Sequence, residues 1–297
     1  MKQTFQRYPD LESYLERTAH GIMSLVEPYS VLSYGCLTLD DFSKKYSTIE
    51  LIVILKKGLW AQDYDKISEI VDFTFSINNE YAEKTLIYFL PLEMIENPRV
   101  KFDNLEGMKI HGKEQEIVTN YPLSPIDDFL VREKGETIAG AEMRELFPLP
   151  PSEFFWNVFV ENIALIEKWT KEYPFQQTAN PDYFIAVNRL LYFPRLLYSI
   201  KEKGAIGKTK VVYWFSSEYQ NEIGDFIVEV GVSRKKDLPL VNILDIEEKS
   251  MKLLDFCIKE VLTTHKVKYN GLSDLIIKRE EVYDYSRFFM EIRNLLI

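Results

Sequence analysis

Two oxygen-bearing side chains, Thr48 and Glu50, stand two residues apart at the start of an apolar, β-branched run that ends at Leu55. Side chains two residues apart in a strand point to the same face, so we expect this hydroxyl and carboxylate to lie side by side. A second short apolar run ends just before them, at Gly35 and Cys36. A glycine turn beside oxygen ligands can hold a phosphate group through backbone N–H groups and Mg²⁺ through the carboxylate.

This layout resembles the site of nucleotidyltransferases of the polymerase-beta type, and the resemblance implies transfer of a nucleotidyl group from a nucleoside triphosphate to a hydroxyl. Such a reaction needs a held triphosphate, a cation that neutralises it, and a base that accepts the proton of the hydroxyl. We expect Glu83 to begin the next strand, over 84–90, and to be that base. Thr48 supplies only a neutral oxygen, so one charge is missing from the expected metal site. Asp40 or Asp41 could replace it, and the sequence leaves both open.

The same residues also have ordinary structural interpretations. A single glycine between a strand and a polar loop is usually a turn, and Cys36 is a weak hydrogen-bond donor. A strand that carries Thr48 and Glu50 on one face is typical of a half-exposed antiparallel sheet. Glu83 by itself is typical of a solvated strand end.

The surrounding pattern predicts an α+β domain that positions these residues, followed by helices. We expect helices over 10–28 and 63–79 and from Ser124 onward, strands over 31–34, 49–55, 84–90 and 137–139, and a loop or short hairpin within 98–125. The proline-rich stretch 146–151 is the expected boundary between a domain at 1–150 and one at 151–297. The second domain is expected to be a helical bundle, with helices over 152–173, 182–203, 208–219, 221–233, 246–264 and 280–297.

Composition narrows the classes of function. The net charge of −10 disfavours broad binding to nucleic acid, because an acidic surface repels phosphate backbones. Two cysteines far apart form neither a disulfide framework nor a zinc motif. No window resembles a signal peptide or a membrane span. We therefore expect a cytoplasmic protein whose partners are small molecules.

Three segments resemble the aminoglycoside adenylyltransferases that modify streptomycin and spectinomycin, which are nucleotidyltransferases of the polymerase-beta type. That family typically has Gly-Ser-Leu-Ala-Leu-Gly-Asp-Phe followed by Ser-Asp-Ile-Asp-Leu-Leu-Val, then a segment ending in Glu-Leu-Phe, then Arg-x-Leu-Tyr-Thr with Gly-x-Ile-x-Ser-Lys and a tryptophan. The segments similar to these are Gly35–Phe42 with Ser47–Val53, Gly135–Gly140 with Glu145–Pro148, and Arg195–Ser199 with Gly204–Thr209 and Trp214.

The resemblance implies a role for residues of the first domain. Gly35 and Cys36 would lie at the triphosphate of ATP, and Thr48 and Glu50 would occupy the two positions that hold Mg²⁺. Glu83 would match the general base of the family. The family has Asp where this chain has Thr48, Asp where it has Glu50, and Ser where it has Cys36, so all three departures fall at one site.

The resemblance also implies roles in the helical domain. Arg195 and Lys208 would bind the phosphates of ATP from that domain, and Asp182 and Trp169 fall near the stretch that contacts the antibiotic in the family. Without the resemblance, Arg195 and Lys208 would be solvated or paired with acidic side chains, and tryptophans such as Trp169 would be core residues.

Three functions follow from these observations. The first is an enzyme that transfers AMP, or another nucleoside monophosphate, to a hydroxyl of a small molecule such as an aminoglycoside. The second is a catalytically inactive descendant that binds a nucleotide or a protein partner, as the loss of a carboxylate at Thr48 suggests. The third is a structural interaction protein, which only the acidic surface and the aromatic-rich helices support.

Overall fold

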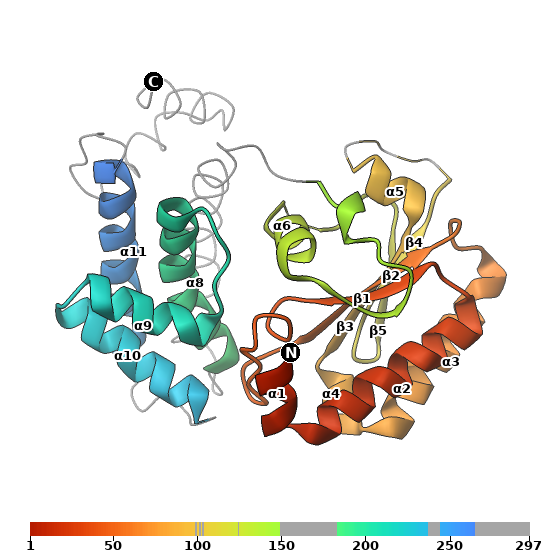
Figure 1. The fold of residues 1–297 in the computed structure, drawn as a ribbon, viewed down its shortest axis with the longest axis horizontal. Coiled ribbons are helices and arrows are strands. Elements are labelled where there is room, and N and C mark those ends of the chain that lie inside the picture. The colour runs from red at the N-terminus through yellow and green to blue at the C-terminus, as the bar shows by residue number, and fades with distance from the viewer. Residues whose placement is uncertain are drawn as a thin grey trace. The chain divides into compact units, whose positions relative to one another are not determined.

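A computed structural model describes residues 1–98, 100, 102, 104–123, 125–148, 183–236 and 244–264. The contacts between Cα atoms divide the chain into two compact units, Met1–Pro151 and Ser152–Ile297. Figure 1 traces both along the chain. Each unit is described below by itself.

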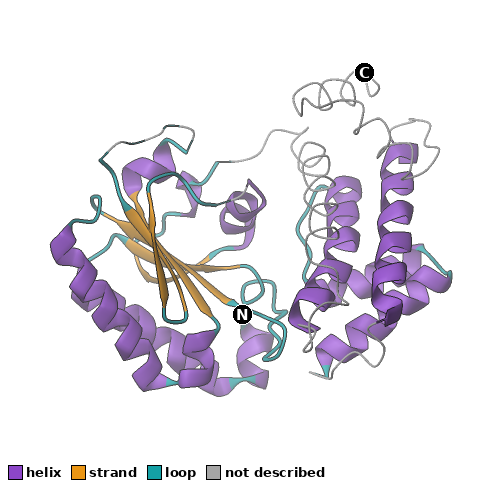
Figure 2. Ribbon diagram, turned by 180° about the vertical axis from the view of Figure 1, so that it is seen from behind, coloured by secondary structure: helices purple, strands orange, loops and turns teal. Residues whose placement is uncertain are grey.

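The first unit is a mixed six-stranded sheet with helices on both faces, as the α+β prediction requires. The strands run in the order β5-β4-β3-β2-β1-β6, and of these neighbours β2 and β3 are parallel while the others are antiparallel. Figure 2 shows the twist of this sheet. The strands are β1 (Ser30–Tyr34), β2 (Ile49–Leu55), β3 (Thr85–Pro91), β4 (Gly107–His111), β5 (Glu114–Val118) and β6 (Glu136–Gly140). The helices are α1 (Lys2–Arg7), α2 (Pro9–Val26), α3 (Ala61–Ile77), α4 (Asn79–Glu83), α5 (Leu92–Glu96) and α6 (Pro125–Lys134), followed by a 3-10 turn at Arg144–Leu146.

The strand β2 separates two buried layers because its side chains alternate between the faces of the sheet. Ile49, Leu51 and Val53 join one apolar cluster with buried residues of α2 and α3. Glu50 and Ile52 point to the opposite face, where α6 packs against β1. Figure 1 shows α2 and α3 on one side of the sheet and α6 on the other. The start of β2 therefore carries its only carboxylate, Glu50, toward the α6 side.

Two features of the first unit differ from the sequence predictions. The short helices α1, α4 and α5 were not predicted, and α4 forms because the side chain of Asn78 accepts a hydrogen bond from the backbone N–H of Tyr81. The expectation that Glu83 begins a strand is wrong: it is the last residue of α4, and β3 starts at Thr85. The hairpin expected within 98–125 is formed by β4 and β5.

The described part of the second unit is helical, which confirms the predicted helical C-terminal region. Its helices are α8 (Tyr183–Glu202), α9 (Lys208–Glu218), α10 (Glu222–Lys235) and α11 (Leu244–Thr264). Helix α8 contacts each of the other three. The helices expected over 152–173 and 280–297, and the predicted cap at Ser124, lie outside the described residues. Within the described residues, no helix is both long and apolar enough to cross a bilayer.

Candidate functional site

The turn after β1 brings Gly35 against Glu50. Tyr34, the last residue of β1, pairs with Glu50 across the antiparallel ladder, so the chain turns directly over the glutamate. Gly35 has a φ of +70°, which L side chains rarely adopt. A Cβ atom at this position would lie 1.9 Å from Oε2 of Glu50. A glycine is therefore required here both by the backbone conformation and by the carboxylate that lies against it.

Thr48 and Cys36 complete this group of predicted residues. The Thr48 hydroxyl donates a hydrogen bond of 3.1 Å to Oε1 of Glu50, although Thr48 lies just before the first residue of β2. The Cys36 thiol donates to the backbone carbonyl of Thr48 at 3.0 Å. The structure thus brings Gly35, Cys36, Thr48 and Glu50 together, with the two oxygens of the carboxylate held in different surroundings.

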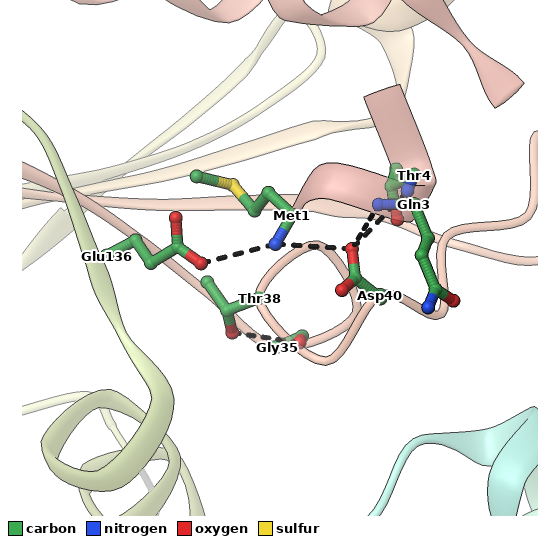
Figure 3. Close-up of polar contacts among 7 residues, drawn as sticks. All are labelled: Met1, Gln3, Thr4, Gly35, Thr38, Asp40 and Glu136. Atoms are coloured by element: carbon green, nitrogen blue, oxygen red, sulfur yellow. Dashed lines mark hydrogen bonds and ion pairs between the residues drawn. The ribbon is translucent and has the colours of Figure 1, made fainter. Parts of the chain in front are cut away.

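Asp40 contacts the start of helix α1. Its Oδ1 accepts hydrogen bonds from the backbone N–H groups of Gln3 (3.1 Å) and Thr4 (3.3 Å). The same oxygen lies 3.2 Å from the Met1 ammonium, which also contacts Glu136 at 3.2 Å (Figure 3). Three donors already share this carboxylate oxygen, so Asp40 is committed to the N-terminal segment.

Glu83 is not among the residues that the structure places beside Glu50. Its helix, α4, contacts α3, and the neighbouring Tyr81 belongs to the apolar cluster on the opposite face of the sheet from Glu50. The Glu83 side chain is exposed. On β3, the residues in register with Glu50 and Ile52 are Leu86 and Tyr88, so this face of β3 presents no carboxylate there.

A carboxylate that the sequence analysis did not single out, Asp127, lies on the Glu50 side of the sheet. It is half-buried in the first turn of α6. Burial raises the pKa of Tyr34 well above its ordinary value, and the charges of Asp127 and Glu50 raise it further. Burial and the same two charges raise the pKa of Tyr88 to about 12. Only the packing of α6 on β1, which sequence spacing does not reveal, brings Asp127 here.

In the second unit, Arg195 and Lys208 are joined through one short loop. Arg195, on α8, donates from Nε to the backbone carbonyl of Ile206 at 3.0 Å. Gly207 caps α9, and Lys208 is the first residue of that helix. Both cationic side chains are half-buried. The loop therefore brings a guanidinium and an ammonium to the positive end of a helix, an arrangement that suits a phosphate group.

Two predicted residues and the predicted metal site remain to be described. Asp182 and Trp169 lie outside the described residues. The part of the chain that the structure describes contains no cluster of three or more His, Cys, Asp or Glu side chains that could hold a metal ion. Glu50 and Thr48 offer hard oxygen atoms, which Mg²⁺ accepts when phosphate oxygens and water supply the other ligands.

Comparison with known proteins adds a likeness of fold. No protein-family model matches this chain, and no curated protein matches it either. Among solved structures, the chain is similar to spectinomycin adenyltransferase AAD(9) from Enterococcus faecialis, whose crystal structure holds ATP and spectinomycin. The TM-score is 0.58 at 12% sequence identity, over 82% of this chain and 97% of that one. The fold expected from the sequence is thus confirmed: a nucleotidyltransferase fold, with a mixed six-stranded sheet followed by a helical region.

Proposed function

We propose that this protein binds a nucleoside triphosphate together with Mg²⁺ and transfers its nucleotidyl group to a hydroxyl of a small molecule. The observation that carries the proposal is that the Glu50 carboxylate lies against Gly35 in the turn after β1. This turn belongs to a fold similar to that of an adenyltransferase. Gly35 and Cys36 would contact the triphosphate through the backbone. ATP and an aminoglycoside-like acceptor are the candidates that the likeness to AAD(9) suggests.

In this proposal, Glu50 holds the cation and Thr48 orients Glu50. The hydrogen bond from the Thr48 hydroxyl fixes one carboxylate oxygen, and Gly35 leaves room for the other. When bound, Mg²⁺ would carry part of the triphosphate charge and so ease displacement of pyrophosphate. Arg195 and Lys208 would bind phosphate oxygens, the first through its planar fork and the second as a point charge.

The role of Glu83 separates this function from a second candidate, nucleotide binding without transfer. Glu83 is exposed at the end of α4 and is not among the residues that lie beside Glu50. This position favours the second candidate, because a general base must lie within reach of the acceptor hydroxyl. If Glu83 is the base, Glu83→Gln abolishes release of pyrophosphate from ATP while ATP affinity stays unchanged. If wild-type protein binds ATP but releases no pyrophosphate with any hydroxyl acceptor, the second function is correct.

The proposal is tested by calorimetric titration of ATP with and without Mg²⁺. We expect binding that strengthens with Mg²⁺, and we expect Glu50→Gln to weaken the Mg²⁺-dependent affinity by at least about tenfold. Glu114→Gln, an exposed acid on the edge strand β5, removes the same charge elsewhere in the unit and serves as the control. Failure of every triphosphate to bind, or to raise the melting temperature at millimolar concentration, would refute the proposal.

A further inference from the structure

A cavity of about 350 Å³ lies at the carboxyl end of β2, where α2 ends and α3 begins. Figure 1 shows these two helices on the same side of the sheet. Leu25 and Val26 of α2, Leu55 of β2, and Leu59 in the loop before α3 form an apolar wall of the cavity. Along β2, Glu50 and Leu55 lie about 17 Å apart, at about 3.3 Å per residue. The cavity is therefore separate from the group around Glu50, and its volume suits a small molecule.

Three lysines line the same cavity: Lys56 and Lys57 directly after β2, and Lys66 on α3. The Lys66 ammonium lies 3.8 Å from Oδ1 of Asp63, another residue of the wall. Among the residues that the structure describes, the side chains of Lys56 and Lys57 form no ion pair. Acids outnumber lysines and arginines in this chain by 46 to 36, so two neighbouring lysines without an acidic partner are unusual here.

The two acids of the cavity wall do not neutralise these lysines. Asp63 is engaged in the first turn of α3, where its Oδ2 accepts a hydrogen bond from the backbone N–H of Trp60 at 3.0 Å. Glu27 follows the last residue of α2, and its side chain is exposed. The start of α3 and the end of α2 carry opposite ends of helix dipoles, so the side chains decide the charge of the wall. Three ammonium groups against two carboxylates leave it with a net charge of +1.

We propose that this cavity binds a small organic anion, a carboxylate or a phosphate monoester that carries an apolar body. Lys56 and Lys57 would bind the anionic group as point charges. The apolar body would lie against the leucine and valine side chains of the wall and so be removed from water. The net charge of the chain is −10, which repels anions, so a local excess of cations is needed to hold one. This site does not depend on the proposed transfer of a nucleotidyl group.

The experiment titrates the full chain with phenyl phosphate and with benzoate, and ligand-observed NMR follows the binding. Each probe joins one anionic group to an apolar ring, and we expect dissociation constants of about 1 mM or lower. Inorganic phosphate carries only the charge and benzyl alcohol has only the ring with a neutral hydroxyl. Both should therefore bind at least about tenfold more weakly than the two organic anions.

Substitution of the two lysines tests the charged part of the cavity. The double variant Lys56→Gln with Lys57→Gln should weaken binding of both organic anions by at least about tenfold. Its control is Lys134→Gln with Lys259→Gln, which removes the same charge from two exposed lysines outside the cavity wall and should bind as wild type does. All four lysines are exposed, so we expect every variant to keep the melting temperature of wild type.

A filled cavity tests the apolar part. Val26 is half-buried in the wall, and Val26→Trp places a large ring in the space that the ligand would occupy. This variant should lose binding of phenyl phosphate and of benzoate. If its melting temperature falls, the lysine variants decide the question.

The results separate this site from the proposed nucleotide site. Glu50→Gln and Lys208→Ala should leave phenyl phosphate affinity unchanged, because neither residue lines the cavity. If Lys208→Ala weakens the probe while the Lys56 and Lys57 substitutions do not, the probe binds at the proposed nucleotide site. The cavity assignment is then wrong and the proposed function is untouched.

Three other outcomes would also overturn the assignment. If neither organic anion binds to wild type, the cavity holds no ligand of this class. If benzyl alcohol binds as tightly as benzoate, the lysines do not select an anion. If the control variant loses as much affinity as the double variant of Lys56 and Lys57, the effect comes from the overall charge of the protein.

Discussion

The Oε2 atom of Glu50 lies where the side chain of residue 35 would begin, 1.9 Å from a Cβ built on Gly35. The turn and the carboxylate therefore fit only with a glycine. Gly35→Ala should move the carboxylate and strain a backbone with φ +70°, at a cost of about 1–2 kcal/mol in unfolding free energy. Urea denaturation measures that cost, and calorimetry should show weaker Mg²⁺–ATP binding.

Gly204 offers a matched control for this substitution. A Cβ at Gly204 would meet its nearest atoms at 3.7 and 3.8 Å, which is ordinary contact. Gly204→Ala should leave stability within about 1 kcal/mol of wild type. Equal effects of the two substitutions on stability and on ATP affinity would show that the packing of Gly35 on Glu50 is unimportant.

Asp40 should act on stability and leave nucleotide binding unchanged. Asp40→Ala removes the acceptor for the N–H groups of Gln3 and Thr4 and places alanine at φ +52°, so we expect a loss of about 1–2 kcal/mol. Asp40→Asn keeps an acceptor and tolerates this conformation, so it should lose less. A fall in Mg²⁺–ATP affinity in Asp40→Asn, measured by calorimetry, would instead make Asp40 a ligand.

Asp128 should make stability depend on pH. Burial raises the pKa of Asp128 to about 7, the Tyr121 hydrogen bond opposes this rise, and the charge of Asp127 adds to it. In the unfolded chain this carboxyl titrates near its ordinary pKa of about 3.9. Between these values the native state binds more protons, so the Asp128 contribution to stability is complete below about pH 4 and is lost as the pH rises toward 7.

The test of this pH dependence is Asp128→Asn, which keeps a neutral side chain at every pH. Urea denaturation at several pH values should show a smaller decline in unfolding free energy between pH 4 and 7 for the variant than for wild type. Glu133→Gln on the same helix is the control and should follow wild type. An unchanged slope in Asp128→Asn would mean that Asp128 is ionised throughout this range.

Substitution of Arg195 and of Lys208 should both weaken ATP binding but should differ in their effect on stability. Lys208→Ala should weaken ATP binding by about tenfold with little change in stability, because it removes a point charge from the start of α9. Arg195→Ala should also lower stability by about 1 kcal/mol, because the bond from Nε to the Ile206 carbonyl is lost. Lys210→Ala, exposed on the same helix as Lys208, is the control. Equal ATP affinity in all three variants would remove this pair from the phosphate site.

The predictions from sequence succeeded where local pattern determines structure. The run Ile49–Leu55 is apolar and β-branched, and β2 has those bounds. Gly35 and Glu50 could be paired in advance because neighbouring antiparallel strands bring them together. Glu83 was misplaced because α4 is a single short helix held by its Asn78 cap. The place of Asp127 could not be predicted, because it depends on the packing of α6 on β1, which no local periodicity records.

The pairing of β6 with β1 determines when the sheet can be completed during synthesis. The outer edge of β1 is covered by residues 136–140, which the ribosome makes long after residues 30–34. Until then, the backbone N–H and C=O groups along that edge stay open to pairing with another chain. A nascent or truncated chain that stops before residue 136 should therefore be prone to aggregation and should depend on chaperones.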